Sequence, residues 1–568
     1  MAVTQRATRL RGPGAADMPS PVDLVWSLGL CVLIGVPLLL ALWSAIAAAL
    51  DLSAWHAMLT DRQTWHALAL SLGTGIASSL FAVGLCAWIL SRSFPVRWPR
   101  VVRLLGPMLA VPHAAFGIGL VFLISPSGWI LRVLSPWATG HSAPPPWMTS
   151  QDPWGIGLVL ALAAKEVPFL LWAAAAQLQR ADVAQRLSRE LDLARSMGYA
   201  PHTAWWRVVW PQLWPRLAWP MLAVLAYSMT VVDVALVIGP ASPPTLAVLA
   251  WSWLRDADLA VNRQGAAAAW LLAVALAVVA TVCWQLATSR LWRARRTTGH
   301  RGMRRTIIVS GAGLPVLGAL VGLYLAVMLA LAVGSVSGVW PFPGLLPQNL
   351  SLAAWTSVLA SSSTVVTTLT LALASGGAAL LWSLAWLETA PPAWDAWLRR
   401  VIYLPLVLPS VLWVVGVHAI SLRWGLDARW SGLWLAHSLA CVPYVLITLG
   451  PAYSGFDPRY RHVSASLGHG RATYLLRVKW PLLRAALWSA FAVGFAVSVA
   501  QYLPTLFIGA GRFATVTTEA VTLASGGQRS LTSAYAWLQW LLPVLGFALA
   551  AWAGKPRRFR NAGTPRPA

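Results

Sequence analysis

Charged side chains are scarce in this chain of 568 residues, where they make up 10% of the sequence. Soluble domains carry about 25% charged residues, so an ordinary soluble domain is excluded. Hydrophobic residues make up 58% of the chain instead. Apolar runs of about 20 residues cross a bilayer as helices, which satisfy their own backbone hydrogen bonds. Twelve such runs predict an all-α polytopic membrane protein: about 22–50, 66–90, 103–124, 154–178, 217–239, 265–287, 307–333, 361–386, 400–421, 432–454, 485–509 and 532–553.

Acidic residues are rarer still, at 17 against 42 Lys and Arg, and the formal net charge is +25. If the N-terminus is cytosolic, 33 of the 42 basic residues lie in cytosolic segments, eight in external loops, and Lys165 within a span. This asymmetry follows the positive-inside rule, and it predicts a multi-pass membrane protein with both termini in the cytosol. The basic run 289–306 is interpreted as a topology determinant beside anionic lipid, in preference to a nucleic-acid site.

The patterns that carry catalysis or bind metals are also missing. The four cysteines lie far apart within predicted spans, with neither metal-site spacing nor the arrangement of a disulfide framework. We find no paired carboxylates, nucleophile–base spacing or metal cluster. The Gly-Lys-Pro sequence at Gly554 lacks the upstream glycine and the hydroxyl residue of an ATP-binding Walker A loop. The sequence therefore predicts a chain that is not an enzyme and has no catalytic residues, metal or cofactor of its own.

Two polar stretches in the apolar sequence resemble each other at a constant offset of 270 residues. We call them the first repeat loop (190–211) and the second repeat loop (460–481). Seven of sixteen aligned positions are identical, against about one expected by chance. The identical residues are Ser196, Gly198, Thr203, Arg207, Val208, Trp210 and Pro211, matched by Ser466, Gly468, Thr473, Arg477, Val478, Trp480 and Pro481. Upstream, "LAVPHAAFGIG" (109–119) matches "LVLPSVLWVVG" (406–416), proline on proline and glycine on glycine.

This similarity predicts a tandem duplication of a six-span unit. Because six is even, both copies have the same orientation, and they form parallel repeats with a central cavity between them. The predicted order is a cytosolic tail (1–21), a first half (22–288, core 66–287), a basic linker (289–306), a second half (307–554, core 357–553) and a basic tail (555–568).

Each repeat loop lies between the fourth and fifth predicted spans of its half, on the cytosolic side. A polar helix runs to Gly198 or Gly468, where glycine takes the left-handed conformation just past a helix end. An amphipathic segment follows and stops before Pro211 or Pro481, which break the helix. We therefore expect a short helix–turn–helix on the cytosolic face. An ordinary loop would account for the composition but not for one spacing used twice.

The repeat loops resemble the "EAA" motif of type I ATP-binding-cassette (ABC) importer permeases, E-A-A-x3-G-x9-I-x-L-P. The thirteen-residue step from glycine to proline is kept in both. The isoleucine position is Val208 or Val478. The start departs from the motif: Asp192, Leu193 and Ala194 in the first repeat loop, and His462, Val463 and Ser464 in the second, replace Glu-Ala-Ala.

The chain is similar in size to fused double permeases for ferric iron and thiamine. This resemblance implies that the repeat loops couple the chain to two ATPase subunits, which hold ATP and magnesium. It also implies a periplasmic or surface-tethered binding protein that delivers a small solute. The chain would then lie in the lipid bilayer of the bacterial inner membrane and work by alternating access. Thiamine-like solutes, ferric iron and other small solutes all stay open as substrates.

Ionisable residues within the predicted spans are candidates for the transport path, because a charge at the bilayer centre costs about 2.5–3.5 kcal/mol. Lys165 and Glu166 lie mid-span, where the second half has Ala440 and Cys441. They serve either the pathway or a contact between helices. Asp233 lies in the fifth span, which faces the pathway in the family, and the matching stretch of the second half contains Gln501. Asp233 suits a cationic solute or a gate, or else it is a hydrogen-bonded residue near the interface.

Two other classes of protein fit parts of the sequence. A proton-coupled transporter of the major-facilitator type also has twelve spans in two parallel halves joined by a basic loop, but it leaves the repeat loops unexplained. A membrane scaffold without transport leaves the duplication unexplained. The sequence favours the ABC importer permease.

Overall fold

The computed structural model describes residues 20–178, 181–289 and 313–555. Within these ranges the regular structure is helical, apart from an isolated bridge between Ser337 and Leu350. The predicted tails and basic linker lie almost wholly outside the described residues. The helices of the first half are α1 (Pro21–Ala48), α2 (Leu52–Thr60), α3 (Arg62–Ser93), α4 (Trp98–Leu109), α5 (His113–Ile124), α6 (Trp129–Leu134), α7 (Ile156–Leu178), α8 (Ala181–Ser196), α9 (Pro201–Ala204), the π-helix η1 (Trp205–Val209), α10 (Trp210–Thr230), α11 (Asp233–Ile238), α12 (Leu246–Leu254) and α13 (Leu259–Thr288).

The second half repeats this order of elements. Its helices are α15 (Gly313–Ser335), α16 (Ala353–Ala360), α17 (Ser362–Thr389), α18 (Pro392–Ile402), the 3-10 helix η2 (Leu404–Leu406), α19 (Ser410–Arg423), α20 (Trp430–Ser454), α21 (Arg459–Ser466), α22 (Arg471–Tyr474), the π-helix η3 (Leu475–Lys479), α23 (Trp480–Leu482), α24 (Arg484–Ala500), α25 (Leu503–Gly509), α26 (Val516–Ala524) and α27 (Arg529–Ala553). Elements from the repeat loops onward recur 270 residues later: η1 and η3, α12 and α26, and α13 and α27 all begin at that offset.

The number of membrane-spanning helices differs from the twelve predicted. Among the described residues, nine helices are long and apolar enough to cross a membrane, or eleven if each of two bent pairs is one span. The bends measure 109° between Pro392–Leu406 and Ser410–Arg423, and 77° between Arg471–Leu482 and Arg484–Ala500. The predicted span 217–239 is divided between α10 and α11. Hydropathy averages over a window, so it does not detect such breaks.

Pro112 and Pro409, aligned in the sequence repeat, each precede a helix and have extended backbones. Proline disfavours the helical conformation in the residue before it and lacks an N–H. The predicted spans 103–124 and 400–421 are consequently divided at these prolines, into α4 and α5 and into α18 and α19. Both halves thus have the same break at the same place.

The first helix of each half packs on the other half. Helix α1 contacts α19, α17 and α18, while α15 contacts α5 and α3. The aligned glycines make room for these crossings: a Cβ at Gly416 would overlap the Ala41 carbonyl oxygen of α1. A Cβ at Gly119 would lie 2.6 Å from Val327 Cγ1 of α15. The glycine-on-glycine match in the sequence therefore marks two equivalent close helix contacts.

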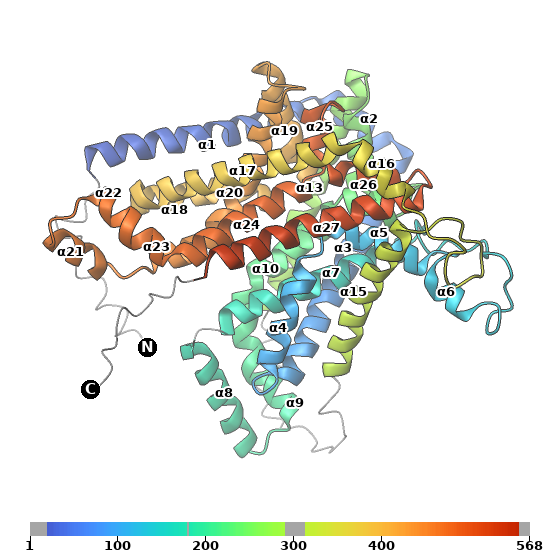
Figure 1. Ribbon diagram of the computed structural model, residues 1–568, viewed down its shortest axis with the longest axis horizontal. Helices are drawn as coiled ribbons and strands as arrows, with labels where there is room; N and C mark the ends of the chain where they lie inside the picture. Colours follow the sequence, from blue (N-terminus) through green and yellow to red (C-terminus); the bar gives the residue numbers. More distant parts are fainter. Residues whose placement is uncertain (1–19, 179–180, 290–312, 556–568) are drawn as a thin grey trace, which may run out of the picture.

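The two halves diverge from a shared end. In Figure 1, helices α3, α4, α7 and α10 run toward the bottom of the view, and α17, α18, α20 and α24 run toward the left. The repeat loops lie at the ends of these two arms, α8 and α9 at the bottom and α21 and α22 at the left. The arms meet around α5, α19, α25 and α26 in Figure 1, and α11 contacts α5 and α26 there; we call this region the far end. Buried apolar side chains of both halves form one cluster there, and each arm has a cluster of its own.

Candidate functional site: two repeat loops and a polar cluster between the halves

Both repeat loops turn at the predicted glycine. Helices α8 and α21 end at Ser196 and Ser466, and two residues later Gly198 and Gly468 have φ of 87° and 76°. The next amide closes the turn in the same way in each loop. Tyr199 N donates to Ala194 O at 3.1 Å, and the amide of His469 donates to the matching Ser464 oxygen, also at 3.1 Å. This is the glycine C-cap expected for such a helix end.

The expected helix break before Pro211 and Pro481 is wrong. The π-helices η1 and η3, which contain Val208 and Val478, continue directly into α10 and α23, and each proline is the second residue of that next helix. A proline near a helix start loses no needed N–H, and the wider π turn shifts the hydrogen bonds ahead of it. The second half does break, but after the proline, at Leu483.

The turns present matching apolar side chains to the surroundings. Leu193 and Met197 of the first repeat loop are 62% and 55% exposed, and Val463 and Leu467 at the same positions of the second are 58% and 68% exposed. The small residues Ala194 and Ser464 between them are buried against the rest of the loop. Exposed apolar patches on a protein are typical of interaction sites.

The acidic start of the motif lies beside these apolar side chains. Asp192 is exposed and pairs with Arg195 at 3.4 Å, and His462 is exposed at the equivalent place. The departure of His462 from the motif therefore changes the surface of the second repeat loop and not its interior.

The two repeat loops are held to their arms by different contacts. Glu388 at the end of α17 accepts hydrogen bonds from Lys479 Nζ at 2.8 Å and from the Tyr453 hydroxyl at 2.6 Å. Arg471 binds the Glu388 backbone oxygen at 3.0 Å and Asp23 of α1 at 2.5 Å. These contacts join the second repeat loop to three helices through a charged network.

The first repeat loop uses an amide and aromatic rings. Gln212 donates to Glu190 Oε2 at 2.5 Å, which ties α10 to α8. Four indole rings follow one another along the segment with neighbouring centroids 5.5 to 6.1 Å apart: Trp205, Trp206, Trp210 and Trp214. Neither anchor was found from the sequence. The sequence did contain an indication of Glu388, since it is an acidic residue just after the predicted span 361–386, on the same side of the membrane as the basic second repeat loop.

Lys165 is buried in a contact between helices. Its ammonium donates to Val111 O at 2.5 Å and Met108 O at 3.3 Å, and lies 5.5 Å from the ring centre of Tyr324 on α15. The carbonyl groups at a helix end lack partners within the helix, so the lysine satisfies those left by the break between α4 and α5. Of the two hypotheses for this residue, the geometry favours the interhelical contact.

Glu166 and Asp233 lie around a histidine that the sequence reasoning missed. Glu166 Oε1 is 3.2 Å from His113 Nε2, and Asp233 interacts electrostatically with the same imidazole. The His113 ring packs 4.6 Å from that of Tyr227. His113 is partly exposed, and its signal in the sequence was its position directly after Pro112. We call His113, Glu166, Tyr227 and Asp233 the polar cluster.

The polar cluster adjoins the contact between the two halves. Ser410 of α19 donates to Thr230 O of α10 at 3.4 Å, at the break that precedes Asp233. The matching break of the second half contains Gln501, and there His437 is hydrogen-bonded to Ser498 and Thr505, both at 2.9 Å. Each half therefore has a broken helix beside the contact between the two halves.

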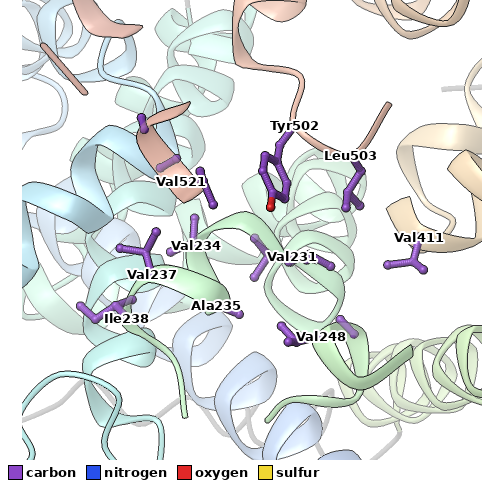
Figure 2. Packing of buried hydrophobic residues seen from close by; sticks show 14 of the residues in the cluster. Val231, Val234, Ala235, Val237, Ile238, Val248, Val411, Tyr502, Leu503 and Val521 are labelled. Atoms are coloured by element: carbon purple, nitrogen blue, oxygen red, sulfur yellow. The ribbon is translucent and has the colours of Figure 1, made fainter. Parts of the chain in front are cut away.

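Apolar side chains close the junction at the far end. Figure 2 shows Val231 and Val248 of the first half opposite Val411 and Leu503 of the second, with Tyr502 beside them. We call these five residues the apolar closure. The repeat loops are therefore apart, and the two halves are in contact at the far end.

The chain is 36% identical over 548 residues to the inner membrane ABC transporter permease protein YnjC of Escherichia coli (strain K12), covering 94% of this chain and 98% of the relative. This chain belongs to the inner-membrane ABC transporter permeases. The permease is also 26% identical over 291 residues to the thiamine transport system permease protein ThiP of Brucella suis, covering 46% of this chain and 52% of that one. It is 33% identical over 127 residues to the molybdenum transport system permease protein ModB of Mycobacterium bovis, covering 20% and 48%.

No family model matches the permease. Membership of the family nevertheless confirms the resemblance that the repeat loops indicated, the helical membrane fold and the role as a transport subunit. It gives no support to the major-facilitator alternative.

Proposed function

We propose that this permease is the membrane subunit of an ABC importer and that its two repeat loops are the docking sites for two ATPase subunits. The matched apolar side chains, Leu193 and Met197 and their counterparts in the second loop, support this proposal because two equal ATPases need two equal surfaces. The glycine turn fixes these side chains at the tip of each loop. In this proposal both termini and the repeat loops are cytosolic, and the far end is external.

Alternating access follows from the arrangement of the arms. The conformation in Figure 1 faces inward, with the apolar closure holding the external end shut. Binding of ATP between the two ATPases draws the repeat loops together and separates the closure. Hydrolysis returns the arms to the inward-facing state. A binding protein delivers the solute at the external end, and no bond in the solute changes.

The polar cluster is proposed as the part of the path that meets the solute, and a small cation as the solute. Glu166 and Asp233 supply two carboxyl groups, while the Lys165 ammonium is directed toward backbone carbonyls. Two carboxyl groups between the halves favour a cation. The relatives are named for thiamine and molybdenum, so the proposal for the solute depends on this cluster and not on the relatives.

The proposal is tested by purifying the tagged permease from its native membrane in mild detergent and counting its partners. Wild type is expected to bring down two copies of an ATPase. Gly198→Val and Gly468→Val are expected to lose them, because a β-branched residue resists the left-handed conformation of these turns. Gly470→Val is the matched control: Gly470 lies two residues further on, with φ of −70° and open space around it.

A permease that came down alone and transported on a proton gradient would overturn the proposal. The path is tested separately with Asp233→Asn in the reconstituted transporter. We expect this variant to keep both ATPases but to lose about tenfold or more of its transport rate for a cationic solute, since it removes a charge from a site of low dielectric. An unchanged rate would place Asp233 outside the path.

A further inference from the structure

A cavity of about 480 Å³ opens at the far end of the molecule, between the two halves. Its walls come from the segment between α5 and α6 of the first half, and from α15, α16 and the start of α27 of the second. These elements lie at the right of Figure 1, away from both repeat loops. The volume is in the range of sites that bind ligands, and it is separate from the polar cluster and the apolar closure.

Arg132 builds one wall of this cavity. The side chain is buried, and it donates to four backbone oxygens, those of Ser127 at 2.9 Å, Pro341 at 2.9 Å, Gly344 at 2.5 Å and Trp340 at 3.1 Å. These bonds join the first half to the loop between α15 and α16. The acceptors are neutral, so the charge of the guanidinium is not cancelled.

Arg529 lies at the opening, in the first turn of α27. One of its nitrogens donates to Ser127 Oγ at 2.5 Å, and the side chain is otherwise exposed. A guanidinium has five N–H donors, so Arg529 can bind a further acceptor. A helix N-terminus carries partial positive charge, and the arginine therefore adds to the positive potential at this place. Arg529 and Arg132 also interact electrostatically as like charges.

Among the described residues, none that lines the cavity is acidic. Two arginines therefore face one cavity with neutral partners only. Such a site has a positive potential that an anionic group from outside the chain would lower.

The first half has Leu259 where the second half has Arg529, because α13 and α27 begin at the same offset. One turn further along α13 lies Arg263, and its guanidinium pairs with Asp51 at 3.0 Å. Asp51 is the residue that caps helix α2. The corresponding helix of the second half, α16, is preceded by Leu352, which has no charge. The first half thus supplies its own carboxylate, and the second half does not.

We propose that this cavity receives an acidic side chain on a protruding segment of the solute-binding protein, with Arg529 binding the carboxylate. The inference rests on the proposed importer function, in which the far end is external. A carboxylate alone would leave most of the volume empty, so the occupant is a segment of chain. Because both halves line the cavity, the strength of this contact depends on the position of the two halves relative to each other.

The test uses the whole transporter, with its ATPases, in nanodiscs of zwitterionic lipid. The probe is the solute-binding protein that co-purifies with the permease from its native membrane, added in increasing amounts while ATP hydrolysis is measured. Arg529→Gln is expected to raise the half-saturating concentration about tenfold and to leave basal hydrolysis unchanged. Arg263→Gln is the matched control, because its arginine is already paired within the chain, and it is expected to change the value by less than about twofold.

Salt gives a second readout that a merely structural role of Arg529 would not change. Between about 50 and 300 mM KCl, wild type is expected to lose affinity for the binding protein, and Arg529→Gln is expected to lose less. Arg529→Glu combined with an acid-to-lysine change on the binding protein is expected to recover the affinity that Arg529→Glu alone loses.

Equal half-saturation for wild type and Arg529→Gln, with wild type fully stimulated, would overturn the inference and leave the importer function intact. A difference in ATP hydrolysis between wild type and Arg529→Gln that arises only when phosphatidylglycerol is added, without the binding protein, would assign the cavity to a lipid headgroup. That result would also overturn the inference. A wild type that no binding protein stimulates would overturn the importer function itself.

Discussion

Glu388→Gln is expected to loosen the second repeat loop from its arm while leaving the first in place. The carboxylate lies between Lys479 and Tyr453, and its side chain is 18% exposed while that of Lys479 is 13% exposed. Glutamine keeps the shape but cannot neutralise the ammonium. Removing one partner of a fully buried pair costs about 3–5 kcal/mol, and exposed pairs contribute about 1 kcal/mol or less.

For this partly buried pair we expect a loss of about 2 kcal/mol in the free energy that holds the loop, which corresponds to a factor of about 30 in the equilibrium for opening. The assay is amide hydrogen exchange of residues 471–482 in the purified permease, where protection should fall by about that factor. The double variant Glu388→Gln with Lys479→Met should recover part of the loss, because it no longer leaves a charge unpaired.

Glu190→Gln provides the control in the first repeat loop. Glu190 is half-exposed and pairs with Arg186 at 3.7 Å, and the glutamine that replaces it still offers an oxygen to the Gln212 amide. The change should therefore alter protection in that loop by less than about threefold. Protection of residues 471–482 that is unchanged by Glu388→Gln would refute the reasoning. A double variant that shows the plain sum of the two single losses would also refute it, because independent sites add and coupled charges do not.

Two further predictions concern contacts between helices. Gly416→Ala should destabilise the permease by more than about 3 kcal/mol, because its Cβ would overlap the backbone of α1. The effect should be measurable as a lower melting temperature or as failure to fold. Gly377→Ala is the control, because its Cβ would enter open space and the change should be neutral; equal melting temperatures for the two variants would contradict the close contact. His437→Phe should cost about 2 kcal/mol because it leaves the buried Ser498 hydroxyl without its partner, while the Thr505 hydroxyl keeps its bond to Gln501 O. The loss is measured as a lower melting temperature, and an additional Ser498→Ala should restore part of it.

The repeat loops show how far sequence reasoning reached. The spacing from Gly198 to Pro211, used again from Gly468 to Pro481, predicted two equal turns, and both glycines have the left-handed backbone. A turn of this kind is a local property, since it depends on which residue tolerates a positive φ. The expected helix break at the prolines was wrong, because proline is compatible with the second position of a helix and a π turn absorbs the change.

The candidate path residues show where the reasoning ended. Lys165 and Glu166 were singled out correctly as buried charges, but their partners lie about fifty residues away, in the break between α4 and α5 and on His113. Residue type and local spacing do not predict contacts between residues so far apart in the sequence. Pro112 marked the break, yet the sequence did not indicate that the next residue would face Glu166.

The sequence by itself determined the membrane class, the duplication and the two glycine turns of the repeat loops, because hydropathy, repeat identity and glycine spacing are local quantities. Only the tertiary structure decided that α1 and α15 each pack against helices of the other half, that Glu388 anchors one repeat loop, and that Arg132 and Arg529 share a cavity. These features join residues up to about 400 positions apart, and they arise from how helices pack once both halves are folded.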